Sequence, residues 1–228
     1  MSQYFGGKAR IGKQLASVVN QYTEGVIYAE PFCGMYSVGS RVQAARKLAS
    51  DAQPDLILLL QDIQAGWAPP DCLSEERYQQ LKSEAPSALR GFAGFSCSFG
   101  GKFFGGYARN GQRNYADVGR RSLLRLRPLI QDTLFAVRDY KETPASQVTY
   151  CDPPYAKTTG YTVGEFDSDE FWQWCRDRAG MVLISEYVAP SDFDLVWSKP
   201  VKTDMRTKAN GREQRIEKLF LAPERCYT

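Results

Sequence analysis

Val26-Ile27-Tyr28-Ala29-Glu30 is a short apolar run that ends at an acidic residue, and Lys47-Leu48-Ala49-Ser50-Asp51 ends at a second acid 21 residues after the first. Each run predicts a strand. Pro31-Phe32-Cys33-Gly34 predicts a loop between them, and 40–48 can be helical. Two acid-ended strands about 20 residues apart are typical of a doubly wound α/β sheet that binds a nucleoside cofactor, since the second acid holds ribose hydroxyls.

The same α/β pattern continues towards the C-terminus. Apolar spacing predicts helices over 55–63 and 117–132, and a third over 168–178 with Ser168 as its N-cap. Apolar runs predict strands at Leu134–Val137, Val148–Cys151 and Met181–Ser185. Leu195–Trp197 and Lys218–Leu221 are predicted to close the sheet as an antiparallel pair.

The α/β pattern is interrupted between Gly66 and Pro144. The stretch 91–119 holds eight glycines interleaved with seven aromatic residues, a composition that predicts neither a helix nor a linker. We therefore expect one α/β domain made of 1–65 and 145–228. The segment 66–144 is an insert, whose last helix and strand, about 118–140, can pack on the α/β domain.

Charge is unevenly distributed along the chain. The net charge is +3, but Pro86 to Lys141 contains ten basic and three acidic residues, so the remainder is net acidic. A basic middle on an acidic body is typical of a protein that binds a polyanion. The alternative interpretation of the arginine run Arg120–Arg127 is a solvated helix face.

The composition excludes several kinds of site. The chain has no histidine, which removes Ser-His-Asp and Cys-His nucleophile systems and every histidine-containing metal site. Its six cysteines form no C-x-x-C pair, so we expect no metal. No apolar run is long enough to span a membrane and the N-terminus shows no signal-peptide pattern, so we expect a cytoplasmic protein.

Asp152-Pro153-Pro154-Tyr155 directly follows a predicted strand. The two prolines fix the backbone and remove two N–H donors, so the Asp152 carboxylate and the Pro153 carbonyl become neighbouring acceptors. Tyr155 adds a planar ring beside them. Two acceptors and a ring suit a planar group that bears an NH₂, such as the exocyclic amine of a base. The alternative interpretation is an ordinary turn.

Together with Tyr4-Phe5-Gly6-Gly7-Lys8, these motifs resemble the Dam-type (alpha class, D12) adenine-N6 DNA methyltransferases, and the compact size of the chain resembles that of phage-borne or orphan methyltransferases. The resemblance implies a Rossmann-like class I methyltransferase sheet with a small, basic target-recognition insert. It implies S-adenosylmethionine as methyl donor. By this resemblance the donor would be contacted by Tyr4, Lys8, Glu30, Phe32, Gly34, Asp51 and Asp152. One departure from the family pattern is Gly34-Met35-Tyr36, where the family usually has glycine at the third position.

The resemblance further implies methylation of N6 of an adenine that is flipped out of double-stranded DNA, with Asp152, Pro153, Pro154 and Tyr155 as the catalytic tetrad. The recognised site is expected to be short or loosely read. Phe166 either closes over the flipped base or belongs to the core. The alternatives are methylation of cytosine N4, methylation of adenine in RNA, and a DNA-binding relative without catalysis. No obligatory protein partner is inferred.

The insert also supplies candidate DNA-binding residues. Arg109-Asn110-Gly111-Gln112-Arg113-Asn114 contains residue types that can hydrogen-bond guanine or adenine edges. We expect Arg109, Asn110, Gln112, Arg113 and Asn114 to enter a groove, or alternatively to touch only phosphates. Phosphate contacts are expected from Arg120, Arg121, Arg125 and Arg127.

Overall fold

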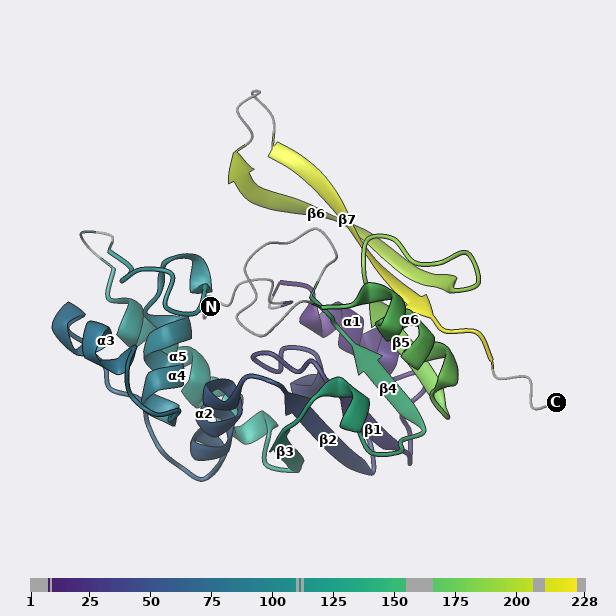
Figure 1. Cartoon of the computed structure of the whole chain (residues 1–228), viewed down its shortest axis with the longest axis horizontal. Helices are drawn as coiled ribbons and strands as arrows, with labels where there is room; N and C mark the ends of the chain where they lie inside the picture. Colours follow the sequence, from purple (N-terminus) through teal and green to yellow (C-terminus); the bar gives the residue numbers. More distant parts are fainter. Residues whose placement is uncertain are drawn as a thin grey trace.

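The computed structural model describes residues 8, 10–109, 111, 113–154, 166–206 and 212–224, without the side chains of 202–206 and 212–215. Its centre is a seven-stranded sheet in the order β3-β2-β1-β4-β5-β7-β6 (Figure 1). The first five strands in that order are parallel, and β7 is antiparallel to both β5 and β6. The strands are β1 Ile27–Glu30, β2 Arg46–Asp51, β3 Thr133–Val137, β4 Val148–Cys151, β5 Met181–Ser185, β6 Asp194–Arg206 and β7 Arg212–Leu221. The expected Rossmann-like α/β sheet is confirmed.

Helices lie on both faces of the sheet. The helices are α1 Gly12–Val19, α2 Pro54–Gln64, α3 Glu75–Leu81, α4 Ala88–Ser96, α5 Tyr115–Leu126 and α6 Ser168–Asp177. One face buries Tyr28 and Tyr150 against α1, whereas the next residue on β4, Cys151, packs with Phe171 of α6. Successive strand residues point to opposite faces, so α1 and α6 lie on opposite sides of the sheet.

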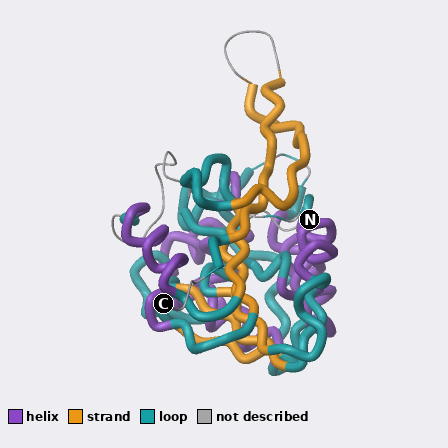
Figure 2. Tube along the Cα trace, turned by 90° about the vertical axis from the view of Figure 1, so that its right-hand side faces the viewer, coloured by secondary structure: helices purple, strands orange, loops and turns teal. Residues whose placement is uncertain are grey.

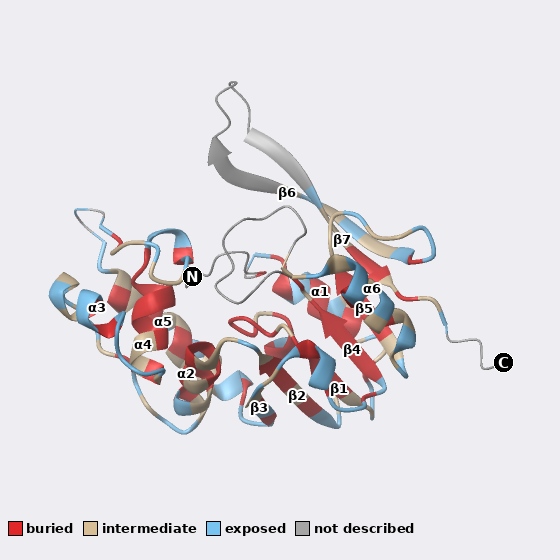
Figure 3. Ribbon diagram, in the orientation of Figure 1, coloured by how far each residue is buried: buried red, intermediate tan, exposed pale blue. Residues whose placement is uncertain are grey.

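The helical lobe, defined here as α3, α4 and α5 with their connections, shares one apolar core with α2 (Figures 1 and 3). β3 follows this lobe in the chain and returns to the sheet, where it pairs with β2. The 3₁₀ turn η3, Arg127–Leu129, links α5 to β3. The segment 66–144 therefore contains both the lobe and one strand of the sheet.

The prediction that 91–119 is too rich in glycine for a helix is wrong. α4 contains Gly91 and Gly94, and α5 contains Gly119. A Cβ on Gly91 would lie 2.3 Å from the Asp55 carbonyl oxygen, and one on Gly119 would lie 2.6 Å from Cβ of Ser96. Glycine at these positions allows three helices to pack closely, and that packing offsets the cost of about 1 kcal/mol of glycine in a helix.

The helix expected over 40–48 is also absent. A 3₁₀ turn, η1 Gly39–Arg41, is followed by extended chain and then by β2. The amide of Gln43 donates to the Asn20 side chain at 2.9 Å, and the amide of Ala45 donates to the Val26 carbonyl at 3.0 Å. These two amides therefore donate to residues outside the segment, whereas in a helix they would donate to carbonyls four residues earlier in the chain.

The N-cap of α6 is one residue earlier than predicted. Asp167, not Ser168, precedes the helix, and its Oδ1 accepts from the amides of Asp169 and Glu170 at 2.9 and 3.0 Å. An aspartate at this position satisfies two orphan amides and complements the helix dipole.

The antiparallel pair β6 and β7 forms a long hairpin that projects beyond the rest of the molecule (Figures 1 and 2). The base of the hairpin pairs with β5 through Leu219, Phe220 and Leu221. In the described part of the chain, no helix is both long and apolar enough to cross a bilayer.

Candidate active site

The strands β1 and β4 are neighbours at the centre of the sheet, and the connections that leave them pass to opposite sides. In open α/β sheets, ligands bind outside the carboxyl ends of the strands at such a switch point. Glu30 is the last residue of β1, and Asp152 follows the last residue of β4. Asp51 ends β2, the next strand along. The structure therefore brings the three predicted acids to one edge of the sheet.

Asp152 is held by a buried lysine. The Lys8 Nζ lies 2.7 Å from Asp152 Oδ1 and 3.6 Å from Glu217 Oε2. Burial lowers the pKa of Lys8, but the nearby carboxylates of Asp152 and Glu217 outweigh that effect and raise it. The resemblance implied that Lys8 contacts the cofactor, and the structure gives it an ion pair with the predicted catalytic acid.

Glu217 is a site residue that sequence reasoning missed. It lies on β7 in the alternating stretch Arg215-Ile216-Glu217-Lys218-Leu219. Such alternation usually marks a strand whose polar residues face water. Here Ile216 is half exposed, and Glu217 turns towards Lys8. An acid in the middle of a closing strand was the available signal, but its partner is 209 residues away in the sequence.

Asp51 lies where a ribose-binding acid is expected. Its Oδ2 accepts from the Gly34 amide at 3.1 Å and its Oδ1 accepts from the Gln53 amide at 3.0 Å. Burial raises the pKa of Asp51 to about 6, partly offset by these hydrogen bonds. A carboxylate offers about four lone-pair sites, so two hydroxyl donors can be added to the two amides.

Glu30 is buried and accepts a hydrogen bond of 2.6 Å from the Tyr28 hydroxyl. Burial raises the pKa of Glu30 to about 8, against the lowering effect of Tyr28 and of the Gly39 amide. This shift favours the neutral form of the carboxyl. A neutral carboxyl can donate as well as accept at the end of β1.

The loop after β1 shows how this chain accommodates Tyr36 where the family usually has glycine. Gly34 and Tyr36 both adopt left-handed backbone, with φ of 49° and 55°. Tyr36 points into the core, where its hydroxyl lies 3.4 Å from Thr133 Oγ1 and its ring packs edge-on against Phe135. The side chain is completely buried, so the ring is directed into the core. Gly34, the residue nearest Asp51, is retained.

Phe32 belongs to an aromatic cluster beside the site. Its ring stacks on Tyr140 at 5.2 Å and meets Phe166 and Phe171 edge-on. Phe166 in turn lies 5.4 Å from Phe171. Of the two interpretations of Phe166, the structure places it, partly buried, against the core cluster under α6.

Several predicted residues of the insert make contacts within the lobe. Asn114 is the N-cap of α5, where its Oδ1 accepts from Asp117 and its Nδ2 donates to the Asp71 carbonyl. Arg127 donates to the carbonyls of Ile63, Gly66 and Trp67 at the end of α2, and Arg120 donates to Pro69. These contacts stabilise the lobe, so Arg120 and Arg127 are less suited to phosphate than expected.

The remaining arginines are on the surface. Arg109 is exposed and forms an ion pair with Glu75, and Arg113 lies over the Tyr115 ring. Arg121 pairs with Asp117 one turn away at 2.7 Å, and Arg125 is exposed. The predicted site residues Tyr4, Asn110, Gln112 and Tyr155 lie outside the described residues.

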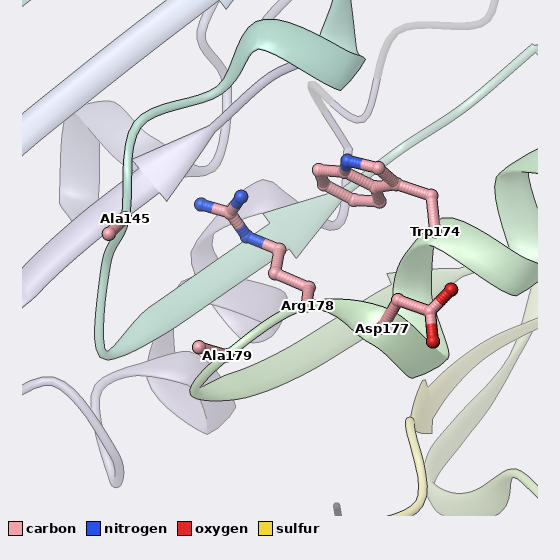
Figure 4. Close-up of a pocket in the computed structure, with 5 residues that line it drawn as sticks. All are labelled: Ala145, Trp174, Asp177, Arg178 and Ala179. Atoms are coloured by element: carbon pink, nitrogen blue, oxygen red, sulfur yellow. The ribbon is translucent and has the colours of Figure 1, made fainter.

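A separate pocket of about 280 Å³ lies at the amino ends of β4 and β5, opposite to the acids (Figure 4). It is lined by Ala145, Trp174, Asp177, Arg178 and Ala179. The Arg178 guanidinium donates to Thr149 Oγ1, Ser146 Oγ and the carbonyls of Thr143 and Pro144, and it packs over Trp174. These contacts give Arg178 a structural role. Among the described residues, no group of three acidic or cysteine side chains is arranged to hold a metal.

Residues 4–90 match the sequence model of the D12 class N6 adenine-specific DNA methyltransferases. This segment is therefore similar to the D12 family. It includes Lys8, Glu30 and Asp51, the residues placed at or beside the edge described above. No curated protein matches the chain.

The solved structures that resemble this chain have low sequence identity and TM-scores below 0.5. They include the rRNA methyltransferase AviRa from Streptomyces viridochromogenes, with 12% identity, a TM-score of 0.46 and coverage of 96% of this chain and 86% of that chain. The tRNA m1G37 methyltransferase of M. jannaschii has 10% identity, a TM-score of 0.44 and coverage of 95% and 50%. Precorrin 8W decarboxylase from Methanobacterium thermoautotrophicum has 9% identity, a TM-score of 0.45 and coverage of 96% and 92%.

The acids at this edge of the sheet can be tested against S-adenosylmethionine, the methyl donor implied by the resemblance of residues 4–90 to the D12 methyltransferases. The partly buried Asp51 carboxylate at the end of β2 can hold the ribose hydroxyls. The Gly34 amide donates to Asp51, and this hydrogen bond holds the loop backbone next to the carboxylate.

We predict that Asp51→Ala weakens binding of S-adenosylmethionine by roughly 10- to 100-fold, because charge-assisted hydrogen bonds contribute about 1.5–3 kcal/mol. Wild-type affinity should also fall as the pH drops below about 6, where Asp51 becomes protonated. Isothermal titration calorimetry at pH 7.5 and pH 5.5 measures both effects. An unchanged dissociation constant for the variant would remove Asp51 from the cofactor site.

Proposed function

We propose that this chain transfers a methyl group from S-adenosylmethionine to N6 of adenine in double-stranded DNA. The observation that carries the proposal is the Asp152 carboxylate, which is ion-paired to Lys8 and followed by Pro153-Pro154 at the switch point between β1 and β4. The D12 match over 4–90 supports the same reaction. S-adenosylmethionine supplies the electrophilic methyl group when bound, and the protein's residues orient the two reactants.

Asp152 and the Pro153 carbonyl are proposed to accept the two N–H bonds of the adenine amino group. Neither proline has an amide hydrogen, so the turn offers acceptors without a competing donor. The Lys8 ion pair holds the Asp152 carboxylate in place. Tyr155 is proposed to stack on the flipped base, a contact worth about 1–3 kcal/mol. Correct orientation is expected to supply most of the rate.

The cofactor is proposed to lie along the ends of β1 and β2. Asp51 would hold the ribose, and Glu30 with the loop Phe32–Gly34 would border the methionine part. Tyr4 is assigned to the cofactor by family resemblance.

The segment 66–144 is proposed to be the target-recognition insert. Arg109 and Arg113 are exposed in the stretch 109–114 of this insert, and Asn110 and Gln112 are assigned with them to base readout. Arg121 and Arg125 are exposed on α5 and are proposed to bind phosphates. Asn114 contributes by capping the N-terminus of α5. As a DNA-modifying enzyme, the protein is expected to act in the cytoplasm.

The double variant Arg109→Ala/Arg113→Ala is predicted to change which adenines are methylated, because each bidentate base contact discriminates by about 1–3 kcal/mol. Arg121→Ala/Arg125→Ala should instead weaken binding at every sequence and reduce the salt slope by about one unit per lost contact. Methylation profiling and salt-dependent binding assays separate the two effects. A wild-type profile for the first variant, at retained activity, would contradict groove reading.

The reaction itself is tested by incubating the purified chain with methyl-labelled S-adenosylmethionine and, separately, duplex DNA and structured RNA. Digestion to nucleosides and mass spectrometry identify the modified base. N6-methyladenine from DNA is the expected product. Label in RNA alone, or in N4-methylcytosine, would replace the proposed substrate, and DNA binding without transfer would indicate a catalytically silent relative.

A further inference from the structure

Glu217 connects the long hairpin to the candidate active site. It lies on β7, which is separated from β4 by β5 in the sheet. Its Oε2 lies 3.6 Å from Lys8 Nζ, and its Oε1 accepts from the Tyr187 hydroxyl at 3.2 Å. The Glu217 side chain is 14% exposed. Each oxygen of this largely buried carboxylate therefore has a specific partner.

Lys8 is shared between two carboxylates that come from different strands. Its side chain is 5% exposed, so water contributes little to solvating the ammonium group. Asp152 contacts it from the end of β4 and Glu217 contacts it from β7. A long, flexible lysine side chain that is held at two points loses the freedom to move away from Asp152.

We propose that Glu217 is a positioning residue for methyl transfer: together with Tyr187 it holds Lys8, and Lys8 fixes the Asp152 carboxylate that receives the substrate's amino group. This inference rests on the proposed function. It assigns to β7 a role in the reaction besides closing the sheet. Glu217 itself is not expected to contact the base or the cofactor.

Charge supports the same arrangement. The groups that face Lys8 are Asp152 after β4, Glu186 and Tyr187 after β5, and Glu217 on β7. Burial lowers the pKa of Lys8, while Asp152 and Glu217 raise it. Removing the Glu217 charge therefore lowers the pKa of Lys8, so the lysine loses its proton at a lower pH.

The test is Glu217→Gln, assayed with whichever nucleic acid the wild type methylates. The variant should lower kcat by about tenfold, while the KM for S-adenosylmethionine stays within about twofold of the wild-type value. The alkaline limb of its pH–rate profile should move to lower pH. Glu217→Asp, which retains the charge, should restore the position of that limb. Glu224→Gln makes the same chemical change at an exposed site beyond β7 and should leave kcat and the pH profile unchanged.

NMR titration of Lys8 in wild type and Glu217→Gln provides a readout that does not depend on activity. Its ammonium should titrate at lower pH in the variant. Wild-type kcat and an unshifted profile in Glu217→Gln would overturn the proposal, as would reduced kcat accompanied only by lower thermal stability. If the wild-type chain has no transfer activity, the proposed function is wrong, and with it the role of Glu217 in catalysis. An unshifted Lys8 titration in Glu217→Gln would separately show that Glu217 does not act on Lys8.

Discussion

Replacing Asp152 with alanine is expected to lower methyl transfer by at least a thousandfold while leaving DNA affinity within about twofold, because affinity comes mainly from phosphate contacts. The variant removes the acceptor that orients the amino group and leaves the buried Lys8 without its nearest carboxylate. Single-turnover transfer from labelled S-adenosylmethionine and a filter-binding assay measure the two quantities separately.

Asp62→Ala is a matched control, since Asp62 is an exposed residue of α2 on which the proposed chemistry does not depend. It should keep wild-type turnover and DNA binding. If Asp152→Ala retained even a tenth of the wild-type turnover, Asp152 would not be the acceptor of the amino group. Loss of DNA binding in Asp152→Ala would show instead that the acid helps to hold the duplex.

Replacing Arg90 with alanine is expected to lower the free energy of unfolding by about 3–5 kcal/mol, the usual cost of removing one partner from a buried ion pair. Arg90 pairs with Asp55, whose side chain is 1% exposed, and it also donates to the carbonyls of Leu81 and Lys82. Asp55 accepts from the Ser87 amide at 3.0 Å. The pair thus joins α2 to α4, and urea denaturation measures its contribution.

Arg77→Ala serves as the control for this prediction. Arg77 forms an exposed pair with Glu84, and exposed pairs contribute less than about 1 kcal/mol. If Arg90→Ala cost no more than Arg77→Ala, the lobe would be held to α2 by apolar packing alone. The close approach of α4 to α2 at Gly91, where a Cβ would lie 2.3 Å from the Asp55 carbonyl oxygen, would be part of that packing.

The sheet was largely predictable because each strand has a local signal. Val148–Cys151 and Met181–Ser185 are mainly apolar runs, each with a single Thr or Ser, and both strands have the predicted bounds. Such runs need no knowledge of distant residues, since a parallel strand is buried on both faces. The acids that end β1 and β2 were predictable for the same reason.

The helical lobe was less predictable because its glycines depend on contacts between helices. Gly91 and Gly119 lower the local helix propensity. They are favourable only because they allow α2, α4 and α5 to pack closely. The absence of a helix over 40–48 has a similar origin, since its amides bond to Asn20 and Val26 from other parts of the chain. Local sequence cannot report these partners.

The acids of the candidate site were predicted from the sequence, but the contacts that join them to Lys8, Glu217 and Tyr187 were not. Glu30, Asp51 and Asp152 were predicted from the ends of strands, but Lys8 and Asp152, which form an ion pair, are 144 residues apart in the sequence. Glu217 was missed because alternation along β7 resembles a solvated strand face, and its partner Tyr187 lies in another part of the chain, after β5. The tertiary arrangement converts these ordinary surface residue types into a buried network.

The most direct test of DNA adenine methylation is long-read sequencing of plasmid DNA from cells that express this chain. Cells that express Asp152→Ala are the control, and the host must lack other adenine methylation. The account predicts N6-methyladenine in a short or loosely defined sequence context in wild-type DNA and its absence in the control. Unmodified DNA, modification only at cytosine, or equal adenine methylation in both samples would contradict it.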